Sequence, residues 1–265
     1  MSKKPDRDIG FLAGSPVRTS LIERLTTGPA QPADLVAHTG SSRTTVHRTL
    51  NELVDRGWVR RVDDGYAITG TGDLALETYQ DARRRFRTLD RFEAFLEGVD
   101  DAPEIELEWL EGARLETESD ENPHRPIERY ADGLATADGE EFYGVTPVIT
   151  RQFIDVHEPI IRGETTVKLV ISNATLRAVA DQYPRQLRES LEFDNYELYA
   201  TDETPSMGTT IYGERVFLGA YDDRRRLVAV VESTDPDLRA WATDCYQRLR
   251  ESATRVTADA AITSD

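Results

Sequence analysis

The sequence is poor in several residue types, and each shortage excludes a class of protein. It holds one cysteine, Cys245, so it can form neither an internal disulfide nor a cysteine metal cluster. No apolar run approaches the roughly 20 residues that a membrane-spanning helix needs. The opening residues MSKKPDRDIG lack the apolar core of a signal peptide. We therefore expect an intracellular, cytoplasmic protein without a membrane segment.

Motifs for catalysis are missing as well. There is no Gly-x-Ser-x-Gly elbow and no phosphate-binding Gly-x-x-x-x-Gly-Lys loop. The four histidines fall in unrelated segments without metal-ligand spacing. These are His38, His47, His124 and His157. We therefore expect no catalytic residues, no metal, no cofactor and no enzymatic activity.

Lysine is scarce, and the charge is uneven. Among 32 basic residues only Lys3, Lys4 and Lys168 are lysines, and 49 acidic residues bring the net charge to −17. Residues 1–97 hold 15 basic and 14 acidic side chains, whereas residues 98–265 hold 17 and 35. The acidic part would be repelled by phosphates, so contact with nucleic acid is expected in the first part.

Residues 16–68 carry the clearest structural signal. SPVRTSLIERLTTG predicts one helix, PADLVAHTG a second that ends at Gly40, and SSRTTVHRTLNELVDRG a third that ends at Gly57. WVRRVDDGYAIT then predicts a strand, a tight Asp-Asp-Gly turn and another strand. This order is typical of a winged helix-turn-helix, which presents its third helix to the major groove of DNA. Residues 1–15 show no periodicity and are expected to be irregular.

The third helix, residues 41–56, has an apolar side that must pack inward and a polar side. Such a helix reads bases mainly through its first turns, and arginine can donate two hydrogen bonds to guanine. Arg60 and Arg61 alternate along the first strand of the hairpin, so one of them should reach a phosphate. A solvated surface is the alternative for each residue. The predicted DNA-binding residues are Ser42, Arg43, Thr44, Thr45, His47, Arg48, Asn51, Arg60 and Arg61.

Residues 71–98 are predicted to form a linker helix. Its apolar positions, which are Ala75, Tyr79, Ala82, Phe86 and Leu89, alternate by four and three and give nearly two heptads. Two interpretations stay open: the helix pairs with its twin in a homodimer, or it packs on its own domain. The arginines at 83–85 and 87 could reach flanking phosphates or form ion pairs. The acidic stretch 100–104, with its proline, marks a domain boundary.

Beyond this boundary, strand-like and helix-like segments alternate, which predicts a mixed α/β sheet with an antiparallel edge. The predicted strands are 113–117, 141–146, 166–172, 196–201, 209–212, 215–221 and 227–232. The predicted helices are 123–136, 147–162, 174–191 and 235–256. The domains are thus expected at 1–70 (winged helix), 71–98 (linker) and 99–265 (α/β effector or dimerisation domain).

A small-molecule site is predicted where two parallel strands end. Open α/β sheets bind ligands at the carboxyl ends of their strands, and helix amino-termini favour anions. Thr146 and Pro147 look like the cap and first residue of a helix, and Ser172 repeats this arrangement. The candidate ligand-binding residues are Thr146, Arg151, Ser172, Asn173 and Thr201, for a small, anionic effector. Ordinary helix capping without a ligand is the alternative.

Family resemblances extend this interpretation. TTVHRTLNELVDRGWV resembles archaeal winged-helix regulators of the ArsR-like and MarR-like kind. The segments EFYGVTPVITRQF, GETTVKLVISNATL and YELYATDETPSMGTTIYGERVFLGAYD resemble the carboxy-terminal domain of archaeal regulators named after a methanogenesis regulatory protein. The resemblance covers residues 100–257 and implies effector sensing or dimer formation. The acidic, lysine-poor composition resembles that of haloarchaeal proteins.

Three hypotheses follow. The first is a cytoplasmic, homodimeric transcriptional regulator that binds a near-palindromic operator of double-stranded DNA and responds to a small-molecule effector. The second is a protein-interaction or architectural module whose winged helix contacts a protein partner. The third is an enzyme with an accessory DNA-binding domain. Some archaeal sensor domains resemble phospholipase D-like folds, but the His-x-Lys pattern of those enzymes is missing here.

Overall fold

A computed structural model describes residues 4–99 and 104–257, and the chain divides into two compact units, Met1–Arg87 and Thr88–Asp265. Residues 100–103 of the expected boundary segment lie outside the described residues. None of the helices in the described ranges is long and apolar enough to cross a membrane. The expected domain limits at 70/71 and 98/99 stay predictions.

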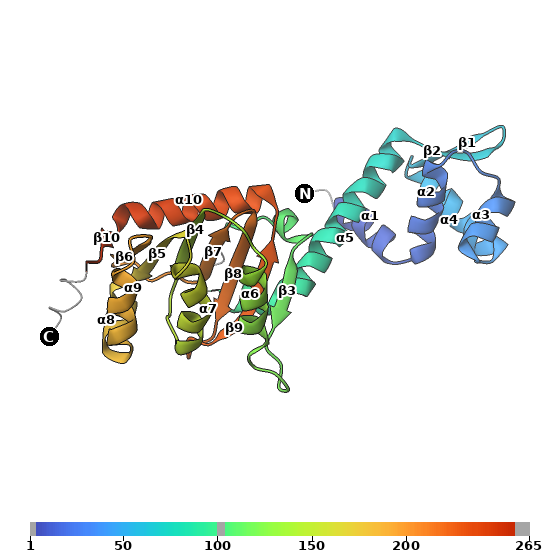
Figure 1. Ribbon diagram of the computed structural model, residues 1–265. Coiled ribbons are helices and arrows are strands. Elements are labelled where there is room, and N and C mark those ends of the chain that lie inside the picture. Colours follow the sequence, from blue (N-terminus) through green and yellow to red (C-terminus); the bar gives the residue numbers. More distant parts are fainter. Residues whose placement is uncertain (1–3, 100–103, 258–265) are drawn as a thin grey trace. The chain divides into compact units, whose positions relative to one another are not determined.

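The first unit consists of helices followed by a small hairpin and a long helix (Figure 1). In chain order its elements are α1 (Lys4–Ala13), α2 (Pro16–Thr26), α3 (Pro32–Thr39), α4 (Arg43–Asp55), β1 (Val59–Val62), β2 (Gly65–Ile68) and α5 (Gly70–Glu97), whose last residues belong to the second unit. Residues 16–68 therefore form the three helices and the two-stranded hairpin that their sequence predicts.

Local chemistry fixes the turns of this unit. Gly40 ends α3 in the left-handed region, with φ of 65°. Gly65 closes the hairpin with φ of 121°, and a Cβ there would lie 2.3 Å from the carbonyl oxygen of Ala30. Ala30 and Tyr66 exchange two backbone hydrogen bonds of 3.0 Å, so a one-residue third strand joins the hairpin. The hairpin is thereby attached to the segment between α2 and α3.

The expectation of an irregular amino-terminus is wrong. Residues 4–13 form α1, whose Phe11 and Leu12 are buried in the first unit's core. The ring of Phe11 packs edge-on against Trp58, with 5.9 Å between the ring centroids. The guanidinium groups of Arg18 and Arg56 lie 4.1 and 3.6 Å from the centroid of the Phe11 ring. Tertiary packing on these partners stabilises a helix that lacks its own periodicity.

Helix α5 carries its predicted apolar stripe in three different environments. Ala75 and Tyr79 pack against the core of the first unit. Phe86 is 71% exposed and Leu89 is 38% exposed. Phe92, at the far end, is fully buried in a core of the second unit. The helix therefore packs on its own units at both ends and presents apolar side chains to solvent between them.

The second unit is an eight-stranded mixed sheet, in the order β10-β6-β5-β4-β7-β8-β9-β3. Strands β6, β5 and β4 are parallel, and the remaining pairs are antiparallel. The strands are β3 (Arg114–Thr117), β4 (Glu141–Thr146), β5 (Thr166–Ser172), β6 (Tyr196–Thr201), β7 (Gly208–Tyr212), β8 (Arg215–Tyr221), β9 (Leu227–Ser233) and β10 (Thr254–Arg255). The predicted mixed α/β class is confirmed.

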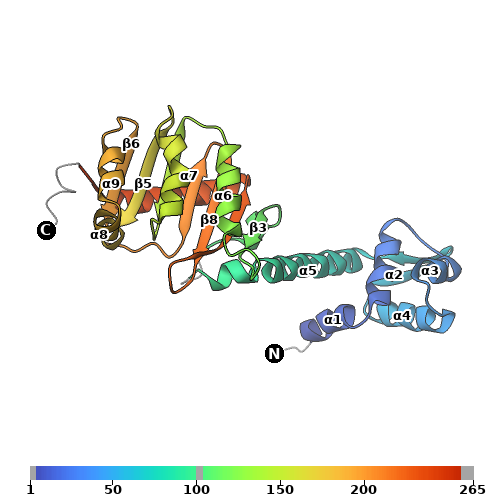
Figure 2. The same cartoon turned by 60° about the horizontal axis from the view of Figure 1, so that its bottom comes forward.

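Helices cover both faces of this sheet (Figure 2). One face carries α6 (Arg125–Ala135), α7 (Arg151–Ile161), α8 (Asn173–Gln182) and α9 (Pro184–Leu191). The other carries α10 (Pro236–Ser252), the end of α5 and the short 3-10 helix η1 (Leu107–Leu110). The helix predicted from 147 is wrong at its start: α7 begins at Arg151, and the Thr150 hydroxyl caps it by accepting a hydrogen bond from the Phe153 amide.

A buried carboxylate ties α6 to the sheet. Glu232 of β9 is 8% exposed and accepts hydrogen bonds from Arg129 of α6 and, at 2.8 Å, from Arg215 of β8. Arg215 also donates to the Gly133 carbonyl at the end of α6. No local sequence pattern indicates this cluster, because Arg129 lies 103 positions from Glu232 in the chain.

Candidate DNA-binding surface and effector cavities

Helix α4 forms because its sequence supplies both a cap and an apolar side. The Ser42 hydroxyl accepts a hydrogen bond from the Thr45 amide at 3.1 Å, which satisfies a free donor of the first turn. Val46, Leu50 and Leu53 are fully buried, as the sequence predicts. This burial fixes the orientation of the helix and leaves its opposite side to solvent.

Most of the predicted DNA-binding residues lie together on that solvent side. The exposed members are Ser42, Arg43, Thr44, His47, Arg48 and Asn51, while Thr45 is half-buried and bonds to Ser42. Within residues 4–99 and 104–257, neither Arg43 nor Arg48 forms an ion pair. Their guanidinium groups are therefore free to donate hydrogen bonds to another molecule.

The two hairpin arginines differ in their surroundings. Arg60 and Arg61 are both exposed on β1. Arg61 donates a hydrogen bond of 3.0 Å to the side-chain carbonyl of Asn51, so one hairpin arginine is attached to the polar side of α4. Arg60 has no such contact among the described residues. The structure thus places Arg61 of the hairpin beside Asn51 on the polar side of α4.

Each of the five candidate ligand-binding residues already has an internal hydrogen-bond or ion-pair partner. Thr146 and Ser172 are buried, and their hydroxyls bond locally, to the Val148 carbonyl and the Thr175 amide. Thr201 is buried and bonds to Ser252. Asn173 donates to Asp202, and exposed Arg151 pairs with Asp155 at 2.9 Å. Ser172 is a helix cap as expected, whereas Thr146 is not one, because α7 begins five residues beyond it and is capped by Thr150.

A cavity of about 670 Å³ nevertheless lies beside the carboxyl ends of β4 and β5. We refer to it as the arginine cavity, because Arg224, Arg225 and Arg226 of the β8–β9 turn line it. Arg226 pairs with Asp222 and Glu118. Arg224 and Arg225 have no ion pair in the described part of the chain. Its other lining residues include His124, Thr150 and Thr175, which belong to the amino-terminal ends of α6, α7 and α8.

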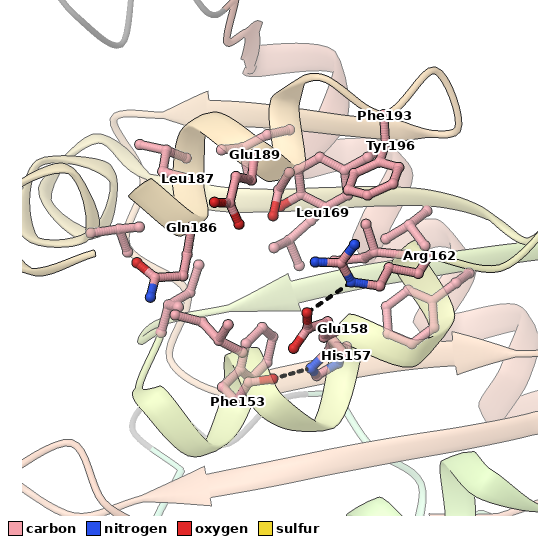
Figure 3. A pocket seen from close by; sticks show the side chains of 18 of the residues that line it. Phe153, His157, Glu158, Arg162, Leu169, Gln186, Leu187, Glu189, Phe193 and Tyr196 are labelled. Atoms are coloured by element: carbon pink, nitrogen blue, oxygen red, sulfur yellow. Dashed lines mark hydrogen bonds and ion pairs between the residues drawn. The ribbon is translucent and has the colours of Figure 1, made fainter. Parts of the chain in front are cut away.

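A second cavity, of about 180 Å³, lies between α7, α9 and strands β4–β6 (Figure 3). We refer to it as the apolar cavity. Its lining is mostly aliphatic and aromatic, with Phe153 of α7, Leu187 of α9 and Leu169 of β5 among its walls. Figure 3 shows the paired side chains of Glu158 and Arg162 beside it.

A chain of hydrogen bonds runs beside the apolar cavity. The Nδ1 atom of His157 lies 2.7 Å from the Phe153 carbonyl, and Nε2 lies 2.9 Å from the Tyr130 hydroxyl. That hydroxyl lies 2.8 Å from the Thr210 hydroxyl. Burial raises the pKa of Tyr130 and lowers the pKa of His157 to about 4. His157 is therefore neutral near pH 7, and both of its ring nitrogens are already in hydrogen bonds.

Because His157 is buried and neutral, we predict that the second unit loses stability in acid. Because its folded-state pKa lies below the ordinary 6.5, the unfolded chain takes up a proton first as the pH falls. The contribution of His157 to stability is fully present above pH 6.5 and is lost as the pH falls from 6.5 to 4. The free energy of unfolding should therefore drop by about 2 kcal/mol between pH 7 and pH 5. Urea unfolding of wild type and of His157→Gln at both pH values measures the difference. The exposed His47→Gln variant is the control, and an equal pH response in all three proteins would contradict the assignment.

Comparisons with known proteins relate both units to known families. Residues 123–252 match the family model described as the middle domain of the methanogenesis regulatory protein FilR1. Residues 6–99 match the model of the HVO_A0261 N-terminal domain. The chain is therefore similar to a transcription regulator. No curated protein matches it.

Solved structures show only distant likenesses. The archaeal chromatin protein TrmBL2 is 15% identical, with 95% of this chain and 99% of that chain covered, at a TM-score of 0.42. The phospholipase D family member Nuc from Salmonella typhimurium is 11% identical, with 55% of this chain and 98% of that chain covered, at a TM-score of 0.42. HmgR from Pseudomonas aeruginosa is 13% identical, with 88% of this chain and 94% of that chain covered, at a TM-score of 0.26. Likenesses this weak carry no argument about function.

Proposed function

We propose that the protein is a DNA-binding transcriptional regulator of archaeal type whose first unit is a winged helix-turn-helix. The observation that carries this proposal is the exposed polar side of α4, which holds Arg43 and Arg48 without ion pairs and is followed directly by a hairpin. Helix α4 would enter the major groove, and the β1–β2 hairpin would be the wing. The match to a regulatory protein's domain supports the same function for the whole chain.

The roles of individual residues follow from their chemistry. Arg43 and Arg48 would donate hydrogen bonds to guanine, and Thr44 and His47 would contact neighbouring base edges. Ser42 and Thr45 would hold the helix start and reach a phosphate. Arg60 would bind a phosphate, while Arg61 holds Asn51 in place. The surface thus combines base-reading and positioning residues.

We further propose a homodimer that reads a near-palindromic operator. The solvent-facing apolar side chains Phe86 and Leu89 of α5 would pair with those of a second copy. Two such copies would place their recognition helices on half-sites about 34 Å apart, or multiples of that distance. A change in the spacing of the two helices, transmitted through α5, would then control binding.

Fluorescence anisotropy of the full chain with DNA from upstream of its own gene tests the function. The logarithm of affinity should fall linearly with the logarithm of salt concentration, because each phosphate contact releases counterions. Salt-independent binding, or binding of no DNA at all, would contradict the proposal and favour a protein partner for this surface. Sedimentation of the complex measures whether two chains bind per operator.

We propose that the effector, a small anionic metabolite, binds in the arginine cavity rather than at Thr146 and Ser172. Arg224 and Arg225 line this cavity without an ion pair in the described part of the chain, and two neighbouring guanidinium groups suit a phosphate or carboxylate. The double variant Arg224→Ala/Arg225→Ala should bind pyrophosphate at least about tenfold more weakly than wild type. Calorimetry of the full chain measures this.

The matched control is Arg177→Ala/Arg185→Ala, which removes two exposed arginines from α8 and α9. Net charge changes equally in the two double variants, so a general electrostatic effect would weaken both. Equal pyrophosphate affinity in the two variants would place the effector elsewhere.

We also propose that the protein acts in the cytoplasm without catalysis. His157, the buried histidine, has both nitrogens in internal hydrogen bonds. Burial raises the pKa of the Cys245 thiol, which keeps it protonated near pH 7 and makes it a poor nucleophile. Among the described residues no group of three histidine, cysteine, aspartate or glutamate side chains is placed to hold a metal ion.

A further inference from the structure

We propose that the second unit has a second ligand site: the apolar cavity binds a small, neutral aromatic molecule that carries one hydrogen-bonding group. The binding itself is independent of the regulator function, whereas its effect on DNA affinity rests on that function. The proposal depends on the size of the cavity, on one unpartnered hydroxyl and on the charges at its rim.

The size of the cavity suits a ligand with one ring. Its volume is about 180 Å³. For comparison, an engineered cavity of about 150 Å³ in another protein, lined by leucine, isoleucine and phenylalanine, stays dry and binds benzene. The apolar walls here include Phe142, Phe153, Leu169, Leu187, Phe193 and Leu198. Such walls favour an apolar molecule over water.

The hydrogen-bonding group of the ligand is inferred from Tyr196. This side chain lines the cavity, is only 8% exposed, and lies in its wall in Figure 3. Its hydroxyl has no hydrogen-bond partner among the described residues, and burial raises its pKa, so it stays protonated. Buried tyrosine hydroxyls usually find a partner. His157 cannot supply one, because both of its nitrogens are already bonded.

The charges around the cavity favour a neutral ligand. Its two arginines are both paired, Arg162 with Glu158 at 2.8 Å and Arg151 with Asp155 at 2.9 Å. The carboxylate of Glu189 adds negative charge on α9. An anion would meet two lining carboxylates and no unpaired cation, and it would lose its hydration on entry. The anionic ligand therefore belongs to the arginine cavity.

The two cavities share a wall. Ile149, Phe153 and Val179 line both of them, and Phe153 also holds His157 through its carbonyl. A ring that fills the apolar cavity would restrict the Phe153 side chain from one side while an anion contacts α7 from the other. A ligand in one cavity is therefore expected to change the affinity of the other cavity for its own ligand.

Phenol and toluene are the probes, because they have nearly the same size and differ in one hydroxyl. Calorimetry or saturation-transfer NMR on the full chain without DNA should show saturable binding of both. Tyr196→Phe should weaken phenol binding about five- to tenfold and leave toluene binding within about twofold. The control Tyr246→Phe removes a buried hydroxyl without a partner that lies outside this cavity, and it should change the affinity for neither probe.

A second variant closes the cavity without removing packing. Ser190 lines it, and Ser190→Phe should weaken both probes at least about tenfold because the new ring occupies the space. Absence of saturable binding in wild type, or equal phenol affinity in wild type and Tyr196→Phe, would overturn the proposal. DNA affinity is measured separately with and without phenol, so the failure of ligand binding and the failure of the regulator function give different results.

Discussion

The double variant Arg43→Ala/Arg48→Ala is expected to bind its operator about 2–6 kcal/mol more weakly than wild type, since each base-reading arginine contributes about 1–3 kcal/mol. Both guanidinium groups are exposed, and neither has an ion pair in the described part of the chain. Alanine in their place therefore removes intermolecular hydrogen bonds and leaves no internal group unpaired. The expected loss is larger on the operator than on unrelated DNA, because these residues read sequence.

The control for this experiment is Arg60→Ala. Because Arg60 is expected to touch a phosphate, its loss should weaken binding to every sequence alike and lower the salt slope by about one. Thermal unfolding should change little in all of these variants, because exposed substitutions usually shift stability by no more than about 0.5 kcal/mol. Unchanged operator affinity in the double variant, or an equal loss on unrelated DNA, would contradict the assignment of α4 as the reading helix.

Replacing Glu232 by alanine is expected to cost the second unit about 2–4 kcal/mol of unfolding free energy. The change leaves the guanidinium groups of Arg129 and Arg215 without their shared carboxylate, and breaking a fully buried pair costs about 3–5 kcal/mol. The side chains of these arginines are 25% and 28% exposed, so solvent lowers that cost. The link between α6 and β9 is lost at the same time.

The comparison is Glu141→Ala, which breaks the partly exposed pair between Glu141 and Lys168 on neighbouring strands β4 and β5. A surface pair of this kind is worth about 1 kcal/mol or less. Urea unfolding in a Trp58→Phe background follows the second unit alone, through Trp109 and Trp241. Equal losses in the two variants would show that Glu232 is not the stabilising centre of this face.

The sequence was sufficient for elements whose signals are local. Ser42 before Val46 and Leu50 is enough to predict α4, because the cap and the apolar spacing lie within one helix. The seven strands of the second unit that the alternating pattern predicts are present to within about a residue at each end. Helix α1 was missed because its stability comes from Phe11 packing on Trp58, which is a contact across 47 positions.

The ligand sites could not be predicted in the same way. Thr146 followed by proline looks like a helix cap, but its hydroxyl donates to the Val148 carbonyl and α7 begins later. The arginine cavity depends on a turn between two antiparallel strands, where no strand-end rule applies. Its only sequence signal was the run Arg224-Arg225-Arg226 in an acidic domain. The apolar cavity is a packing gap among side chains from β4, α7, β5, α8, α9 and β6, which no local pattern encodes.

The two edges of the eight-stranded sheet restrict how copies of this chain can associate. An unpaired strand is a template for further strands, and proteins protect such edges by making them short or charged. Here one edge is β10, with two residues, and the other is β3, with four residues that include Arg114 and Glu116. Neither edge is a long apolar strand with free backbone amides and carbonyls. Self-association by continuing this sheet from one molecule into the next is thereby disfavoured.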